Sequence, residues 1–168
     1  MAWKLDVLVA CLALAVGAGC AHSRSQPPPP PPAPPAAPAE PTAIPLDIVV
    51  IAAAWINPDE QGRSLPTVVR IYQLRATGKL EAAEFQQLYA HPKETLGEDL
   101  IRSDEFVLSP GETAHRRIER EKSAKALAVV PMVRRPAGLS WRTDVELPPP
   151  DKGTQLTFVV EGYRVERR

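Results

Sequence analysis

Cys20 carries the most evident chemistry in this chain, because a thiol at this position can accept a lipid. An apolar run over residues 7–16 precedes it and ends at the small residues Gly17, Ala18 and Gly19. The run is shorter than the ~20 apolar residues that a helix needs to cross a bilayer, so it predicts a secretory signal. Small residues followed directly by cysteine are typical of bacterial lipoprotein signals. We therefore expect residues 1–19 to be a signal peptide and Cys20 to be the lipidation site.

The alternative is an ordinary signal peptide, cut near Gly19, that leaves a free thiol on Cys20. Ala21 is not the aspartate that holds many lipoproteins at the inner membrane, so we expect sorting to the outer membrane. Cys11, the other cysteine, would leave with the signal. The folded part then has no free thiol, and it can form neither a disulfide nor a thiolate metal site.

The remaining reactive side chains form no catalytic pattern. The histidines His22, His91 and His115 make no H-x-x-x-H pair, and the chain contains neither G-x-S-x-G nor a glycine-rich phosphate loop. Adjacent carboxylates such as Asp104 and Glu105 are common in any chain with 24% charged residues. We predict no catalytic residue, no metal site and no cofactor, and we expect a protein that is not an enzyme.

Charge argues against a nucleic-acid partner. The chain has 20 basic and 20 acidic residues, and the loss of Lys4 and Asp6 with the signal keeps the two balanced. No basic face with interleaved aromatic residues is evident. The mixed-sign residues 115–122 are expected to form a solvated edge strand.

Residues 20–45 are expected to form a spacer. They include the tract PPPPPPAPPAAP over residues 27–38. Proline fixes its own φ and favours extended geometry in the residue before it, which predicts polyproline II. At about 3.1 Å per residue the spacer would reach roughly 80 Å from the lipid. The alternative is a docking ligand for an aromatic-lined groove.

Residues 46–168 are predicted to fold as one mainly-β domain. Most segments alternate with a period of two and are separated by Pro or Gly turns, which indicates a two-sheet β-sandwich. The predicted strands cover residues 46–55, 67–74, 106–108, 127–133, 141–147, 155–161 and a last strand around Val165. The first is apolar on both faces and should be covered on both sides. Pro131 should place its strand at an edge or a bulge, and the alternation around Trp141 points Arg142 outward.

A helical insertion interrupts the strands. Phe85, Leu88 and Tyr89 have helical spacing within residues 80–90, and Pro92 should end that helix. A second short helix is expected after Thr95, where Thr95 and Glu98 have the spacing of a capping box. We interpret the apolar stripe as core.

A resemblance to a known family emerges from the order of these segments. The stretch NPDEQGRSLPTVVRIYQL over residues 57–74 is its most specific part. It is followed by the helix with Phe85 and Leu88, by LGEDL at residues 96–100, by LSPGE at 108–112 and by Trp141-Arg142. In this order the chain resembles the lipoprotein of the bacterial type VI secretion system, the TssJ (VasD/Lip) family. The proline tract, Gly17 in the lipoprotein signal and the residues 131–136 depart from the family pattern.

The resemblance implies a transthyretin-like β-sandwich on the periplasmic face of the outer membrane. It also implies a structural role in binding the periplasmic region of TssM, the inner-membrane component of the secretion complex. The family's contact loop maps onto the connection between the first two strands. That loop consists of Asn57, Pro58, Asp59, Glu60, Gln61, Gly62, Arg63, Ser64 and Leu65. Its residues alone, without the resemblance, favour a plain polar surface turn.

Two other functions remain open at this stage. A periplasmic β-sandwich could bind a small ligand or a glycan, which would require a concave aromatic cluster. Trp55 is instead expected at a strand end and Trp141 on an inward face. An envelope hydrolase would require a convergent polar site, and no pattern in the sequence indicates one.

Overall fold

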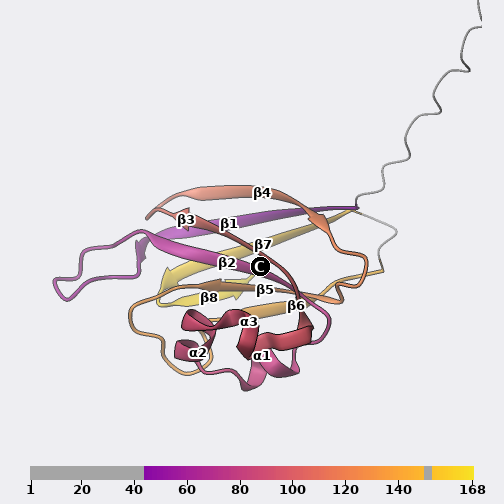
Figure 1. Cartoon of the computed structure of the whole chain (residues 1–168). Coiled ribbons are helices and arrows are strands. Elements are labelled where there is room, and N and C mark those ends of the chain that lie inside the picture. The colour runs from indigo at the N-terminus through magenta and orange to yellow at the C-terminus, as the bar shows by residue number, and fades with distance from the viewer. Residues whose placement is uncertain (1–43, 150–152) are drawn as a thin grey trace, which may run out of the picture. The chain divides into compact units, whose positions relative to one another are not determined.

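The computed structural model describes residues 44–149 and 153–168 (Figure 1). The predicted signal peptide, Cys20 and residues 20–43 of the predicted linker lie outside these residues. Within the described ranges, no helix has the length and apolar character to cross a membrane. The first strand begins at Ile44, so Ile44 and Pro45, the last residues of the predicted linker, are part of the folded unit.

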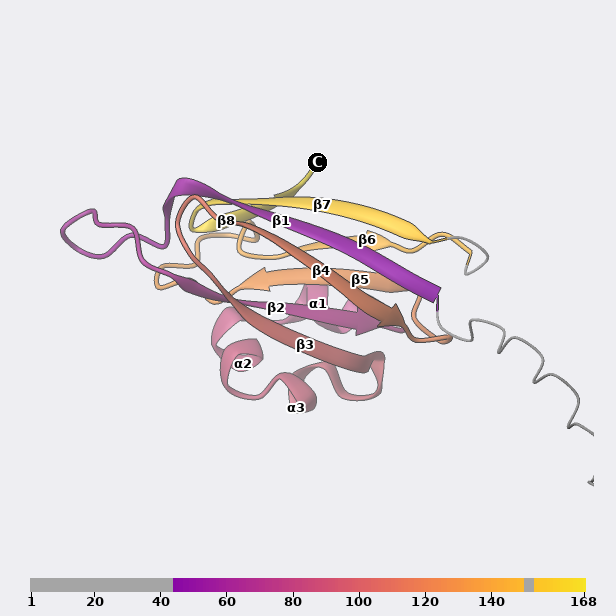
Figure 2. The same cartoon turned by 90° about the horizontal axis from the view of Figure 1, so that it is seen from above.

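Two four-stranded sheets form a sandwich, as the alternating pattern predicts (Figures 1 and 2). In the first sheet the order is β4 (Thr113–Arg120), β1 (Ile44–Ile56), β7 (Thr154–Gly162) and β8 (Arg164–Arg167). In the second it is β3 (Leu100–Leu108), β2 (Thr67–Leu74), β5 (Ala126–Pro131) and β6 (Thr143–Glu146). All neighbouring strands are antiparallel except β1 and β7, which run parallel.

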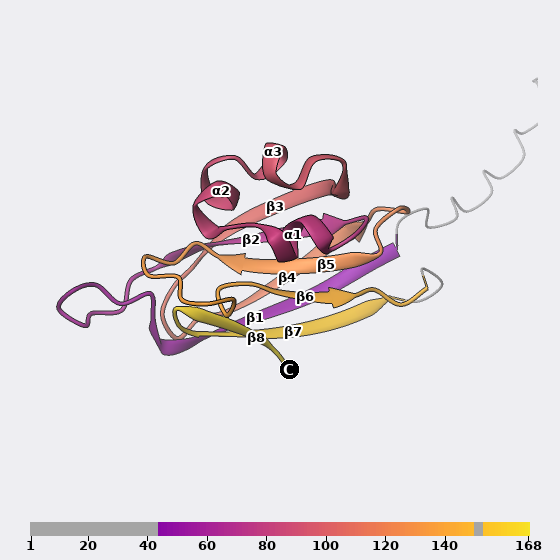
Figure 3. The same ribbon diagram turned by 90° about the horizontal axis from the view of Figure 1, so that it is seen from below.

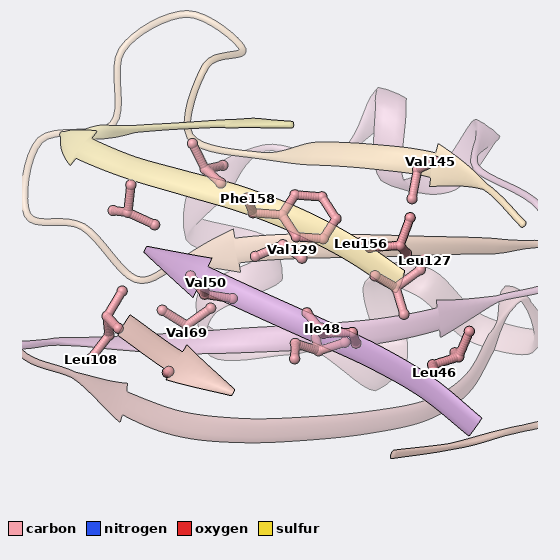
Figure 4. Close-up of a cluster of buried hydrophobic side chains, with 14 of the residues drawn as sticks. Leu46, Ile48, Val50, Val69, Leu108, Leu127, Val129, Val145, Leu156 and Phe158 are labelled. Carbon is pink, nitrogen blue, oxygen red and sulfur yellow. The ribbon is translucent and has the colours of Figure 1, made fainter. Parts of the chain in front are cut away.

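The space between the sheets holds the main hydrophobic core. Side chains on alternate positions of β1, including Leu46, Ile48 and Val50, are almost fully buried; they pack with Phe158 of the neighbouring β7 and with Val129 of the opposite sheet (Figure 4). Burial of each such side chain contributes about 1.5–3 kcal/mol relative to exposure. The outward residues of β1, such as Val49 and Ile51, are only half-buried. The expectation that this strand is covered on both faces is therefore wrong.

Three short helices cover the outer face of the second sheet (Figure 3). They are α1 (Gly78–Ala82), α2 (Phe85–Ala90) and α3 (Pro92–Leu96), and a 3₁₀ turn, η1 (Gly97–Asp99), follows them. Their buried side chains form a second core with the outer side of β2 and β5 and with Trp141; these are Leu80, Phe85, Leu88 and Leu96. Because β5 has cover on both faces, all of its residues are buried.

The helical insertion differs from the prediction in its breaks. One helix was expected over residues 80–90, but Ala83 and Glu84 are extended and separate α1 from α2. The helix with Phe85 and Leu88 ends at Ala90, just before Pro92, as predicted, but a new helix begins there, because Pro92 occupies the start of α3, where a missing N–H needs no partner. No α-helix follows Thr95, whose hydroxyl donates to the His91 carbonyl at 2.8 Å instead of capping a new helix.

Several strands also differ from the prediction. β5 lies between β2 and β6, so the expectation that Pro131 places this strand at an edge is wrong. Pro131 is the last residue of β5, and the next residue, Met132, donates its N–H to the Val68 carbonyl. β3 begins at Leu100, well before the expected residue 106. Arg142 was expected to point outward and is buried. The expected edge strand after His115 is confirmed as β4, and the last strand around Val165 as β8.

Candidate functional site

The connection between β1 and β2 projects beyond the ends of both sheets (Figures 1 and 2). Ile44 opens β1 and Ile56 closes it, so the loop over residues 57–65 lies at the far end of a 13-residue strand from the first described residue. That strand is about 40 Å long at roughly 3.3 Å per residue. The two ends of the strand therefore place the entering chain and the loop at opposite ends of the domain.

The loop is only partly a surface turn. Its tip is exposed and consists of Glu60, Gln61, Gly62 and Arg63. Asn57 and Pro58 at its start are buried, and Asp59, Ser64 and Leu65 are half-buried. The interpretation as a plain polar surface turn therefore describes the tip and is wrong for the base.

Asp59 organises the tip from within. Its Oδ1 accepts hydrogen bonds from the backbone N–H groups of Gln61 at 2.9 Å and Arg63 at 2.8 Å. Its Oδ2 accepts from the Arg63 guanidinium at 2.8 Å. The Asp59 side chain is 7% exposed, whereas that of Arg63 is 75% exposed. Gly62 adopts a positive φ of 78°, which closes the turn at a conformation that favours glycine.

These bonds also set the charge state of Asp59. Desolvation alone would raise the pKa of its carboxyl, but the N–H groups of Arg63 and Gln61 and the guanidinium of Arg63 outweigh it. The pKa of Asp59 consequently lies below its usual value. The carboxylate is thus charged at neutral pH and holds the tip in one arrangement.

The base of the loop is tied to two neighbouring turns. Asn57 has a positive φ of 41°, and its N–H donates to the Gly162 carbonyl at 2.7 Å. Its Oδ1 accepts from the Arg134 N–H at 2.8 Å. The Tyr163 hydroxyl donates to the Pro58 carbonyl at 2.8 Å. Hydrogen bonds to the β5–β6 and β7–β8 connections therefore hold the base of the projecting loop in place.

Other polar groups do not converge on a second site. Within the described residues, no group of three or more His, Asp or Glu side chains is placed to hold a metal ion. His91 pairs with Glu94 at 3.2 Å on the surface, and Asp104 accepts from Arg102 at 3.0 Å. Trp141 is buried edge-on to Phe85, with ring centroids 5.2 Å apart. It packs in the core under the helices and not, as the alternation predicted, on the same face as Val145 and Leu147, which lie in the core between the sheets. The aromatic groove expected of a glycan binder is not formed around it.

Sequence reasoning missed Arg142 as a positioning residue. Its guanidinium donates to the carbonyls of Ala83 at 2.8 Å and Glu81 at 2.5 Å, where the chain breaks between α1 and α2. Burial lowers the pKa of this guanidinium. The Trp141-Arg142 pair was the signal that the sequence offered. The alternating pattern placed Arg142 on the outward face and so did not indicate that its guanidinium is buried.

The described residues thus form a two-sheet sandwich with a helical cover on one sheet and a loop that projects from one end. The profile of the type VI secretion lipoproteins (VasD, EvfM, TssJ) matches residues 44–162, and the chain belongs to this family. The family consists of structural lipoproteins of the secretion machinery and not of enzymes.

Solved structures show the same fold. The T6SS lipoprotein TssJ1 from Pseudomonas aeruginosa is 24% identical, with a TM-score of 0.65 over 75% of this chain and 97% of that chain. A chain of a type VI membrane complex is 26% identical, with a TM-score of 0.69 over 75% of this chain and 98% of that one. A chain in a structure of the T6SS protein TssM C-terminal domain from EAEC is 25% identical, with a TM-score of 0.66 over 74% and 97%. A comparison with curated proteins found no match.

Proposed function

We propose that this lipoprotein is anchored through Cys20 in the outer membrane and binds the periplasmic region of a TssM-like inner-membrane component through residues 57–65. In this role it links the outer membrane to the type VI membrane complex. Residues 20–43 would act as the spacer between the lipid and the domain.

The observation that carries the proposal is the position and rigidity of the loop. It projects beyond both sheets at the end of β1 opposite Ile44, the first described residue. Asp59 and Gly62 fix the tip before any partner arrives, which lowers the ordering entropy that binding must overcome. The solved structures of this fold carry the names of TssM and of the membrane complex, which supports the choice of partner.

The test is a calorimetric titration of the purified mature chain with the periplasmic region of the partner. Cys20→Ser keeps the chain soluble. The loop variant combines Glu60→Ser, Gln61→Ser and Arg63→Ser and retains Asn57, Pro58, Asp59 and Gly62, which hold the loop. The variant also removes the Arg63 guanidinium from Oδ2 of Asp59, but the backbone N–H groups of Gln61 and Arg63 still bind Oδ1. Since the changed side chains are exposed, the free energy of unfolding should stay within about 0.5 kcal/mol. Binding should weaken by about 1–3 kcal/mol if one of these side chains is an interface anchor.

A matched control changes the same kinds of side chain on the helical insertion. Glu84→Ser, Gln86→Ser and Lys93→Ser remove one acid, one amide and one cation from exposed positions. This control should bind like the unmodified domain. Equal affinity of the loop variant would move the contact surface elsewhere. If the unmodified domain does not bind the partner at all, the result favours the alternative function of binding a small ligand or a glycan.

A further inference from the structure

Trp55 presents an aromatic ring to solvent beside the base of the loop. It is 52% exposed, although it belongs to β1 and comes directly before the buried Ile56. Its ring meets that of Tyr163 edge-on, with centroids 6.3 Å apart and an interplanar angle of 62°. The contact with Tyr163 thus holds the exposed Trp55 ring in place at the surface.

The Trp55 ring occupies the space that a side chain on residue 162 would fill, so this position requires glycine. A Cβ atom on Gly162 would lie 2.7 Å from Cζ3 of Trp55, closer than real Cβ atoms approach a ring. Gly162 also has a φ of 57°, so it meets both a conformational and a steric demand of this turn. A larger residue would displace Trp55. The local sequence therefore fixes an exposed tryptophan in one position, which lowers the side-chain entropy that a contact would cost.

Trp55, Gly162 and Tyr163, named here the aromatic platform, border an open cavity of about 360 Å³. Ser140, Glu161 and Arg164 complete its lining. Glu161 and Arg164 pair with each other at 2.7 Å, so neither presents an unmatched charge to an incoming group. The Tyr163 hydroxyl is occupied by the Pro58 carbonyl. Arg164 also lies 3.7 Å from Glu166. The part of the lining that is not engaged in these pairs is aromatic, which suits an apolar side chain.

The platform and the loop form one continuous surface. Tyr163 donates to Pro58, and the Asn57 N–H donates to Gly162 at 2.7 Å, so both ends of the platform touch the start of the loop. Both lie at the end of β1 remote from Ile44, the first described residue. Tryptophan and tyrosine are also the side chains most often found to dominate binding energy at interfaces.

We infer that the aromatic platform is a second contact point for the partner that binds the loop, and that it receives an apolar side chain, aliphatic or proline, from the partner's periplasmic region. This inference rests on the proposed function. The loop tip supplies polar recognition, and the platform supplies the desolvated apolar contact of the same interface.

The test uses 5-fluorotryptophan in the mature chain with Cys20→Ser and an unlabelled partner. Trp3 lies in the predicted signal, so only Trp55 and Trp141 should give ¹⁹F resonances. Trp55→Phe assigns the Trp55 signal. On addition of the partner, the Trp55 resonance should shift and lose its sensitivity to exchange of H₂O for D₂O. The buried Trp141 resonance should stay in place, and Trp55→Ala should weaken affinity about tenfold or more.

Tyr89→Ala is the matched control, since Tyr89 is also 52% exposed but belongs to α2. It should bind with unchanged affinity. If the partner binds and the loop variant weakens binding while the Trp55 resonance stays unshifted, the inference is overturned and the proposed function stands. If the unmodified domain does not bind, the proposed function itself fails. A Trp55 shift on deletion of residues 27–38 in the absence of partner would assign the platform to the chain's own proline tract and would overturn the inference.

Discussion

Oδ1 of Asn57 accepts a hydrogen bond from the backbone N–H of Arg134 at 2.8 Å, which joins the start of the projecting loop to the connection after β5 across 77 positions of sequence. The same side chain donates from Nδ2 to the Pro66 carbonyl at 3.4 Å, where the loop ends. Asn57 is buried, and its φ of 41° lies in a region where asparagine is tolerated better than most residues. One side chain thus fixes both ends of the loop and its attachment to a neighbouring turn.

Asn57→Ala should destabilise the domain by about 2–4 kcal/mol. It leaves the part-buried Arg134 N–H and Pro66 carbonyl without this partner, and alanine tolerates a positive φ less well than asparagine does. Asn57→Gly loses the same hydrogen bonds but tolerates the positive φ, so it should be less destabilising by about 1 kcal/mol. Urea denaturation of both variants checks this order. Equal losses would show that backbone conformation contributes nothing at this position.

Arg142→Met should destabilise the helical insertion by about 2–3 kcal/mol, because the carbonyls of Ala83 and Glu81 lose a charged donor. Amide hydrogen exchange over residues 78–99 should become faster in the variant, and the increase should be larger there than in β1. Arg135→Met, on an exposed arginine, is the control and should change neither measurement. An unchanged exchange rate in the insertion would show that its packing on β2 and β5 is sufficient to hold it.

Alternation predicted much of the sandwich because its signal is local. β2 has the bounds expected from its β-branched residues, and β7 and β8 follow where alternating residues meet Gly162. The strand rule failed for Pro131 because a proline that closes a strand deprives the ladder of no N–H, while Met132 donates in its place. The rule therefore misplaced an interior strand at an edge.

The break between α1 and α2 could not be predicted from its own segment. Phe85 and Leu88 keep helical spacing in one helix or two, and the carbonyls freed at the break are met by Arg142, which is 59 positions away from Ala83. The loop posed the same difficulty. The resemblance identified its residues, but the partners of Asn57 and Pro58 come from turns that are distant in sequence.

Acid should loosen the loop tip through Asp59. Its folded-state pKa is lowered, so the stabilisation is fully present above the unfolded pKa of about 3.9 and is lost as pH falls through the folded value. Asp59 should therefore cause no change in partner affinity between about pH 7 and pH 5. At pH values under about 4, where the carboxylate takes up a proton, the affinity should decrease. Asp59→Asn should bind weakly at neutral pH and lose that acid transition. Titration of the Asp59 carboxyl by NMR checks the assignment, and a pKa above the usual range would contradict it.

Cys20→Ser should abolish palmitate labelling and release the domain from membranes, because no other cysteine remains after residues 1–19 are removed. Metabolic labelling with an alkyne fatty acid and membrane fractionation measure the two effects. Efficient labelling of the variant, or an unmodified protein that fractionates as soluble, would exclude the lipoprotein anchor and favour the alternative of an ordinary signal cut near Gly19.

Replacement of the proline tract should test whether residues 27–43 act only by their reach. Those 17 residues span about 50 Å as polyproline II, whereas a Gly/Ser chain of equal residue count has a root-mean-square span of only about 23 Å. A Gly/Ser segment of about 90 residues matches the longer distance. If reach is what matters, the long segment should preserve recovery of the TssM-like partner with the anchored lipoprotein from membrane extracts, and the short one should reduce it.

Deletion of residues 27–43 gives the lower limit of that series, since the domain would then sit close to the lipid and present the loop too near the membrane. The three variants keep Ile44 and Pro45, which pair with Arg120 and Glu119 in the sheet, so the fold should be unaffected. Thermal unfolding of the Cys20→Ser forms verifies this. Recovery that fails with the long Gly/Ser segment as completely as with the deletion would mean that the prolines themselves are recognised, as a polyproline ligand of an aromatic-lined groove.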